Sequence, residues 1–332
     1  MKIFWVLQAI TGVLAVAGCR KEAPQADMTD FSWHSGADSV ASTGARTAQA
    51  QTGMAEAANG APGPGSGAAA ADGNRARSAG CGLTGKPTGD LHLQGKDGAG
   101  VARDYQVLVP LSYEPSTPLA LTFVYHGGGG SSAEAKALGL QAAPGAAKAS
   151  IFVFPQGIAF QNYGVGWDDR CNGSDMAFFD DMVASLGASY CIDQDRVYAG
   201  GFSWGCDQVT ALSCCRGDKV RAIAAASCSD EFTNPADYKT YQPCPVAGRT
   251  AIRFTHDRTF DRGYPAPLFA TTTTLFRSWN ACSATATPIS PGPCRTFGCR
   301  TPFVDCPYDN LGHSLPTGWG ADSWLFFSGL TP

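Results

Sequence analysis

The sequence has few charged residues and no cluster of positive charge. Charged residues make up 16% of its 332 positions, well below the roughly 25% that is usual for a soluble globular domain. Lys and Arg number 24 against 28 Asp and Glu, which gives a formal net charge of −4, and no basic run is longer than Arg20-Lys21. Proteins that bind DNA or RNA gather positive charge on one surface. The sequence therefore argues against a nucleic acid partner.

The chain also lacks an apolar run of the roughly 20 residues that a membrane-spanning helix needs. The shorter apolar stretch Ile3–Val16 follows a positively charged start and has the length of a signal-peptide core. It ends in Val16-Ala17-Gly18-Cys19, which resembles the lipobox of bacterial lipoproteins; an ordinary signal peptide with an incidental cysteine is the alternative. We expect residues 1–18 to form a lipoprotein signal peptide and Cys19 to carry the lipid.

Residues 19–78 lack any apolar periodicity. They are rich in Ala, Gly, Ser, Thr, Gln and Pro, as in the stretch Ala61–Ala68. Such a composition cannot bury enough apolar surface to offset the entropy of ordering the chain, so we expect a disordered tether. Residues 79–332 remain for the folded part, which is enough for one large core.

Within residues 79–332, short apolar runs alternate with helix-like segments. Several runs are almost continuously apolar, as expected for strands that are covered on both faces. The expected strands are 105–109, 121–125, 151–154, 196–199, 222–225 and 251–254. The expected helices are 133–138, 176–188 (with Ser174-Asp175 as its N-cap), 207–214, 270–279 and one around 324–327. This alternation predicts an α/β fold with a mostly parallel sheet and helices on both faces.

The segment Gly201-Phe202-Ser203-Trp204-Gly205 matches the pattern G-x-S-x-G. An expected strand precedes it and an expected helix follows it, which is the context that the nucleophile elbow of an α/β-hydrolase requires. The helix start also points free backbone N–H groups at developing negative charge. A surface turn with an uninvolved serine is the alternative. We predict that Ser203 is a catalytic nucleophile.

A serine nucleophile needs a base, and the chain has five histidines. In the chain order serine, acid, histidine, only His256 and His313 follow Ser203. Few suitable acids precede His256, so we predict His313 as the base. His126 and His256 each end an expected strand, a position more typical of a hydrogen-bonding anchor, and His92 lies before the expected sheet.

Two aspartates are candidates for the acid that holds the histidine. Asp257 and Asp261 both follow an expected strand between the serine and the histidine. Either aspartate could instead pair with Arg258 or Arg262 on a solvated loop. We favour Asp261 and keep Asp257 as the alternative.

A glycine run supplies the remaining part of an acyl-transfer site. Gly127-Gly128-Gly129-Gly130 follows an expected strand and His126, and resembles the HGGG-type loop whose backbone N–H groups bind an oxyanion. We predict oxyanion donors at Gly128 and at the backbone of Trp204. Trp167 and Trp204 are candidates for lining the substrate site, with a place in the core as the equal alternative.

The sequence contains 13 cysteines, too many for a reducing compartment without metal or redox use. It has no C-x-x-C pair, and no histidine stands at zinc-site spacing from a cysteine pair. With Cys19 assigned to lipid, twelve cysteines remain, and we expect about six disulfides of unknown connectivity. Cys206 is the candidate for a bridge that fixes the elbow, with a buried free thiol as the alternative.

Beyond single motifs, the chain from about residue 80 onward resembles the secreted α/β-hydrolase esterases of carbohydrate esterase family 1. That family includes feruloyl esterases of types C and D, acetylxylan esterases and polyhydroxybutyrate depolymerase-like proteins. The matching stretches, besides the elbow and Gly312-His313, are Gly80-Cys81-Gly82, Tyr125-His126-Gly127, residues 151–157, Gly166-Trp167, residues 175–178, residues 190–193 and Arg196-Val197-Tyr198.

The resemblance implies that Ser203 accepts the acyl group and that His313 is the base, with oxyanion donors near Gly128 and at Trp204. The chain departs from the family in three places. The acid loop usually has glycine after its histidine and the aspartate four residues beyond, whereas here Asp257 replaces the glycine and Asp261 lies five beyond. The other departures are Leu315 in place of a tryptophan, and Trp204 and Cys206 flanking an elbow that usually carries small residues.

These observations favour a serine esterase that hydrolyses feruloyl or acetyl esters on plant polysaccharide through a Ser-His-Asp triad and an acyl-enzyme. Two alternatives are a polyhydroxyalkanoate depolymerase-like esterase and a non-catalytic carbohydrate-binding lipoprotein of the same fold. We expect an ester substrate, no cofactor or metal, a monomer, and membrane contact only through the lipid. The expected location is extracytoplasmic, either lipid-anchored at the bacterial outer membrane or cell surface, or secreted.

Overall fold

The computed structural model describes residues 77–160, 164–228, 244, 246–261, 264, 266–290 and 292–330, all of them within one compact unit. The predicted signal peptide, the predicted lipidation site Cys19 and the predicted tether up to residue 76 lie outside these residues. In the part of the chain that is described, no helix has the length and apolar character that would let it cross a membrane.

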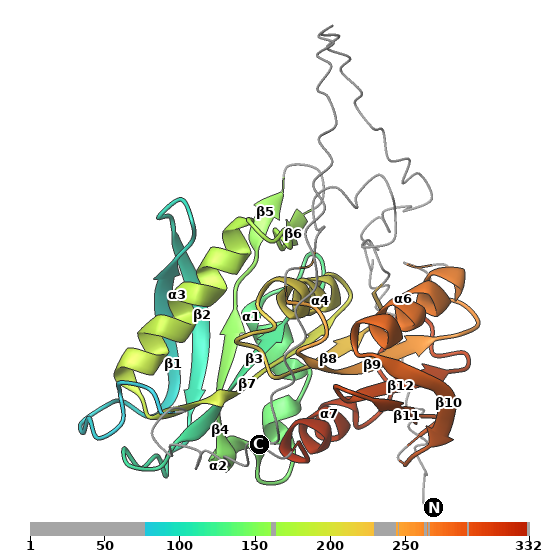
Figure 1. Cartoon of the computed structure of the whole chain (residues 1–332). Coiled ribbons are helices and arrows are strands. Elements are labelled where there is room, and N and C mark those ends of the chain that lie inside the picture. The colour runs from blue at the N-terminus through green and yellow to red at the C-terminus, as the bar shows by residue number, and fades with distance from the viewer. Residues whose placement is uncertain are drawn as a thin grey trace, which may run out of the picture. The chain divides into compact units, whose positions relative to one another are not determined.

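A twisted sheet forms the centre of the domain (Figure 1). Over the described residues it has ten strands in the order β1-β2-β4-β3-β7-β8-β9-β12-β11-β10. The run from β4 to β12 is parallel, and antiparallel strands extend it at both edges. The strands are β1 Gly89–Lys96, β2 Ala102–Val109, β3 Leu119–Tyr125, β4 Ser150–Pro155, β7 Ile192–Phe202, β8 Ala222–Ala226, β9 Ala251–Asp257, β10 Cys282–Pro288, β11 Arg295–Cys299 and β12 Phe303–Tyr308, with a separate hairpin of β5 Ile158–Phe160 and β6 Gly164–Gly166.

Helices cover both faces of this sheet. One apolar cluster joins the sheet to α3, α4 and α6, and a second joins its other face to α1, α2 and α7. Strand β3 shows why, because all its side chains are buried: Leu121 and Phe123 belong to the first cluster, and Ala120 and Val124 to the second. The helices are α1 Ser132–Ala137, the 3-10 turn η1 Leu140–Ala142, α2 Ala146–Ala149, α3 Ser174–Ser189, α4 Trp204–Cys215, α6 Ala266–Trp279 and α7 Trp319–Ser328.

This architecture confirms the predicted α/β fold with its mostly parallel sheet, and each expected strand and helix overlaps an observed one. Other expectations were wrong. The N-cap of α3 is Gly173, because the carboxylate of Asp175 is engaged by Arg103 and the backbone of Asp168. His92 does not precede the sheet but lies within its edge strand β1.

The folded part also begins earlier than predicted. Ser78, placed at the end of the tether, is buried, and its hydroxyl donates to the carbonyl of Tyr190 at 2.6 Å. Its backbone N–H donates to the carbonyl of Ile192 at 2.9 Å. These bonds attach the start of the domain to the amino end of β7.

All twelve cysteines of the described domain are in disulfides, which confirms the prediction of six bridges. The pairs are Cys81–Cys191, Cys171–Cys215, Cys206–Cys228, Cys214–Cys244, Cys282–Cys299 and Cys294–Cys306. Three of them attach α4 to other segments. Among the described residues one group has three potential metal ligands close together, Cys171, Cys214 and Cys215, and all three sulfurs are already bonded in disulfides. Six bridges indicate an oxidising, extracytoplasmic compartment.

Candidate active site

The serine of the G-x-S-x-G motif lies in a tight turn between β7 and α4. Ser203 has φ 55° and ψ −129°, a conformation that costs a residue with a Cβ roughly 1–3 kcal/mol. The flanking glycines make this turn possible: a Cβ on Gly201 would overlap the carbonyl of Gly205, and a Cβ on Gly205 would overlap that of Tyr125. The bridge Cys206–Cys228 holds the first turn of α4, as predicted. In the chain-entropy model its 22-residue separation contributes about 3 kcal/mol to stability.

The structure brings Ser203, His313 and Asp261 together. Nε2 of His313 lies 2.9 Å from Oγ of Ser203, and Nδ1 lies 2.8 Å from Oδ1 of Asp261. Because a carboxylate only accepts hydrogen bonds, Nδ1 carries the proton and Nε2 accepts from the serine hydroxyl. Asp261 is 3% exposed, whereas the side chain of His313 is 28% exposed. The arrangement therefore places a base beside a hydroxyl at the protein surface.

Asp257, the alternative acid, binds backbone instead of the imidazole. Its Oδ1 accepts from the N–H of Thr259 at 2.6 Å and of Phe260 at 3.0 Å, and from the hydroxyl of Thr259 at 2.6 Å. Its Oδ2 accepts from the N–H of Gly312 at 2.6 Å. Burial raises the pKa of Asp257, but these hydrogen bonds outweigh it and bring the pKa down to about 2.

The hydrogen bonds of Asp257 connect two loops of the site. One oxygen ties down the loop that leads to Asp261, and the other ties down the residue before His313. A single carboxylate thus holds both loops that meet at the imidazole. Asp257 is a positioning residue in this geometry, and the carboxylate at His313 belongs to Asp261.

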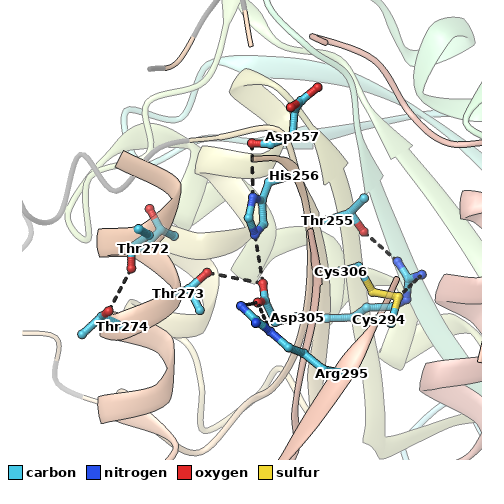
Figure 2. A network of polar contacts seen from close by, with 12 residues as sticks. Thr255, His256, Asp257, Thr272, Thr273, Thr274, Cys294, Arg295, Asp305 and Cys306 are labelled. Carbon is cyan, nitrogen blue, oxygen red and sulfur yellow. Dashed lines mark hydrogen bonds and ion pairs between the residues drawn. A yellow bond between two sulfur atoms is a disulfide. The ribbon is translucent and has the colours of Figure 1, made fainter. Parts of the chain in front are cut away.

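His256 belongs to a separate buried network (Figure 2). Its Nε2 lies 3.0 Å from Oδ1 of Asp305, and its Nδ1 lies 3.3 Å from the carbonyl of Asp257. Arg295 donates to the other oxygen of Asp305 at 2.9 and 2.7 Å. Burial raises the pKa of Asp305, but the hydrogen bond from His256 and the Arg295 guanidinium lower it by more. His256 therefore links β9 to β12, as expected of a hydrogen-bonding anchor.

The glycine loop after β3 is held by His126. Gly157 donates its N–H to Nε2 of His126 at 3.0 Å, so the ring proton is on Nδ1, which donates to the carbonyl of Gly127 at 2.7 Å. Burial lowers the pKa of His126, which favours this neutral form. A Cβ on Gly127 would lie 3.2 Å from the Cβ of Ser203, so the loop passes directly beside the serine.

The two predicted oxyanion donors come from this loop and from the residue that follows the serine. Gly128 is exposed on the loop, and Trp204 is the first residue of α4, where a backbone N–H has no partner within the helix. The glycine loop and the start of α4 thus flank a serine hydroxyl that is hydrogen-bonded to an imidazole. Such an arrangement suits acyl transfer.

Comparison with known proteins agrees with this geometry. No protein-family model matches the chain. Feruloyl esterase C of Emericella nidulans is 30% identical over 250 residues, which cover 68% of this chain and 83% of that protein. The chain belongs to the feruloyl esterase C and D family. The resemblance and the carboxylic ester hydrolase class predicted from the sequence are thereby confirmed.

Other relatives of this family member match over shorter stretches. Feruloyl esterase D of Neurospora crassa is 31% identical over 167 residues, which cover 46% of this chain and 54% of that protein. The chain thus spans about half the length of several curated relatives that it matches. Acetyl xylan esterase from Aspergillus awamori has a TM-score of 0.53 at 13% identity, over 72% of this chain and 99% of that one. At that identity the similarity supports the α/β-hydrolase fold alone.

The two tryptophans predicted at the substrate site of this feruloyl esterase family member differ. Trp167 is 1% exposed, and its indole N–H donates to the carbonyl of His126 at 2.9 Å. Of the two alternatives predicted for Trp167, the structure shows the place in the core rather than the lining of the site, because the ring packs edge-on against Tyr125. Trp204 is half-buried beside the serine, and its ring lies 5.2 Å from that of Phe160.

Two aromatic residues near the site, Phe160 and Tyr264, were not predicted from the sequence. The ring of Tyr264 lies 5.9 Å from that of His313, and its hydroxyl donates to Asp207 of α4 at 3.1 Å. Tyr264 is three residues after Asp261 in the sequence. This short separation was the one indication in the sequence that it lies near the site. Phe160 lies on a three-residue strand and belongs to no motif.

Proposed function

We propose that this chain hydrolyses feruloyl or acetyl esters carried by plant polysaccharide, by serine acyl transfer. The observation that carries the proposal is the chain of contacts from Asp261 through His313 to Ser203, in a member of the feruloyl esterase family. Each contact joins the atoms that a general base and its orienting carboxylate would use.

In the proposed reaction, Oγ of Ser203 attacks the ester carbonyl carbon while its proton passes to Nε2 of His313. The oxyanion accepts hydrogen bonds from the backbone N–H groups of Gly128 and Trp204. The C–O bond to the alcohol then breaks, and the alcohol leaves with the proton from His313. Water, losing its proton to His313, attacks the acyl-enzyme and releases the acid and the serine. Asp261 stabilises the imidazolium in both halves.

Aromatic side chains beside the serine favour an aromatic acyl group over acetyl. The ring of Phe160 packs against that of Trp204, the residue after Ser203, and the ring of Phe202 lies 4.8 Å from that of His313. Aromatic rings gain from offset and edge contacts with another ring. A hydroxycinnamoyl group would find such contacts here, whereas acetyl would not need them.

The proposed location is the outer surface of a bacterial cell or the surrounding medium. The six disulfides of the domain support export to an oxidising compartment. The lipid on Cys19 and the tether of residues 19–78 remain part of the proposal. Mass spectrometry of the N-terminal peptide from membranes of the producing cell would contradict it by showing an unmodified Cys19.

The test compares the full chain with Ser203→Ala on methyl ferulate, acetylated xylan and hydroxybutyrate oligomers. We expect hydrolysis of methyl ferulate to fall by at least about 10³-fold in the variant. Equal background rates for both proteins would contradict the enzyme and leave a carbohydrate-binding protein. Faster hydrolysis of the hydroxybutyrate oligomers than of the plant esters would replace the substrate class.

A further inference from the structure

A hollow of about 680 Å³ lies on the exposed face of the edge strands β1 and β2. The triad does not use it, and no motif of the sequence marks it. Besides Leu93 and Tyr105, its lining consists of polar residues from the two strands, the start of α1 and the residue after β4: His92, Gln94, Asp104, Gln106, Ser132 and Gln156. We call this hollow the edge groove.

Alternation along the two strands builds the floor of the edge groove. His92 faces Gln106 across the antiparallel pair, and Gln94 faces Asp104. Side chains alternate between the two faces of a strand, and the intervening Tyr105 packs into the core. The polar residues therefore share the outer face.

Hydrogen bonds fix these side chains in place. Gln94 donates to Asp104 at 2.8 Å, Gln106 donates to the hydroxyl of Ser132 at 2.9 Å, and the side-chain oxygen of Gln156 accepts from the N–H of Ser132 at 3.0 Å. In these hydrogen bonds each glutamine side chain uses only one of its two polar atoms, the amide nitrogen or the amide oxygen. The other atom of each amide is thus available to a ligand, as donor in Gln156 and as acceptor in Gln94 and Gln106.

One residue of the edge groove, Gln156, lies at the carboxyl ends of the parallel strands, where the candidate catalytic residues also lie. Ser203 follows β7 and Gly127 follows β3, and Gln156 follows the parallel neighbour β4. Gln156 donates its N–H to the carbonyl of Asp104 at 3.0 Å, so it lies beside the end of the groove floor. The next residue, Gly157, bonds His126 of the oxyanion loop.

The sheet order sets the reach between the edge groove and the serine. From β7 the order runs β3, β4, β2 and β1, and neighbouring strands lie about 4.8 Å apart. The floor of the groove therefore lies roughly 14 to 19 Å from the nucleophile strand, and Gln156 at the end of β4 lies roughly 10 Å from it. A chain several sugar units long would reach from one to the other.

We infer that the edge groove binds the polysaccharide arm of the ester substrate, as a neutral chain of sugars. Its lining offers donors and acceptors in fixed positions, as the hydroxyl groups of a sugar require. The lining has no lysine or arginine and includes one carboxylate, which disfavours phosphate. This inference rests on the proposed function and adds a site to it.

The test is a double variant, Gln94→Ala with Gln106→Ala, in the full chain. On a feruloylated xylan oligosaccharide we expect kcat/KM to fall about tenfold, mainly through KM, as the loss of two hydrogen bonds predicts. On methyl ferulate, which has no sugar arm, we expect no change. The matched control is Gln194→Ala. This exposed glutamine lies near the amino end of β7, away from the carboxyl ends of the parallel strands. Its substitution should leave kcat/KM unchanged on both substrates.

Unchanged kinetics on the oligosaccharide ester, or an equal loss on both substrates, would overturn the inference. A binding experiment separates this failure from failure of the proposed function. In a Ser203→Ala background, calorimetric titration with unesterified xylan oligosaccharide should show binding that the double variant weakens about tenfold. Binding of equal strength with and without the two glutamines would overturn the edge groove, whatever the activity.

Discussion

Among the described residues of this domain are two histidine–aspartate pairs, which share residue types but not surroundings. His313 meets Asp261 at 2.8 Å, and His256 meets Asp305 at 3.0 Å. The pairs differ at the other ring nitrogen, which faces a serine hydroxyl in His313 and a backbone carbonyl in His256. A carbonyl cannot give up a proton, so only His313 is arranged as a base.

Exposure separates the two pairs as well. His256 is 5% exposed and Asp305 is fully buried, whereas the imidazole of His313 reaches the surface. Removing one partner of a buried pair lowers the stability of the fold strongly, because the other charge is left unpaired in a low-dielectric interior. A His–Asp contact alone therefore does not identify an active site; the group at the other ring nitrogen and the access to solvent distinguish the two pairs.

The largest effect expected from a substitution in either pair is a loss of activity. His313→Ala removes the proposed base, so kcat/KM for methyl ferulate should fall by at least about 10³-fold, as for other triad members. The free energy of unfolding, measured by urea denaturation, should change by less than about 1 kcal/mol, because the side chain is partly exposed. Retained activity would contradict the proposed role.

The matching change in the buried pair should do the opposite. His256→Ala leaves Asp305 bonded to Arg295 and Thr273 but without its imidazole partner. We expect a loss of about 3 kcal/mol in the free energy of unfolding, with kcat/KM on methyl ferulate reduced less than tenfold in the folded protein. A stable but inactive variant would reverse the assignment of the two histidines.

A third change probes the residue that lies between the pairs. Asp257→Ala removes the bonds that hold the loops of Asp261 and His313, so we expect kcat/KM to fall about tenfold with KM nearly unchanged. Asp257→Asn keeps one carbonyl oxygen, and it should recover part of the loss. If Asp257→Ala matched His313→Ala in effect, Asp257 would be the triad acid after all.

Asp257 also gives the domain a pH dependence with a defined sign. Its pKa is about 2 in the folded protein against about 3.9 in an unfolded chain. The stabilisation is therefore present above pH 4 and is lost as the pH falls towards 2. Chemical denaturation at pH 5 and pH 2.5 should show a smaller decrease for Asp257→Asn than for the wild type.

The smallest effect concerns the exposed arm of the buried pair. Arg295 donates twice to Asp305, but its own side chain is 44% exposed, so solvent screens the interaction. Arg295→Ala should lower the free energy of unfolding by about 1 kcal/mol and leave esterase activity unchanged. Thermal unfolding and methyl ferulate kinetics on the same preparation measure both.

Local patterns in the sequence were enough to predict Ser203 and His313. The serine lies in a five-residue motif between a strand and a helix, and the histidine follows from chain order. The choice between Asp257 and Asp261 needed the structure, because the turn after β9 sends one carboxylate to backbone and the other to the imidazole.

Features that depend on packing or on edge strands could not be predicted from the sequence. Trp167 and Trp204 look alike in the chain, and only their depth in the fold separates them. Strand β1 was not predicted, because polar residues occupy its outer face and interrupt any apolar run. The edge groove, whose residues come from β1, β2 and the starts of two later segments, likewise has no local signature.

Three bridges leave α4, from Cys206, Cys214 and Cys215, and under the proposed export they link the onset of activity to the passage out of the cytoplasm. The helix behind Ser203 is bonded covalently to other segments only after its cysteines are oxidised, and thiols stay reduced in the cytosol. We expect the reduced chain to have little esterase activity and to gain it on oxidative refolding, which a time course with methyl ferulate would measure. The cell that makes this esterase would then be protected from hydrolysis of its own internal esters until the chain has left the cytoplasm.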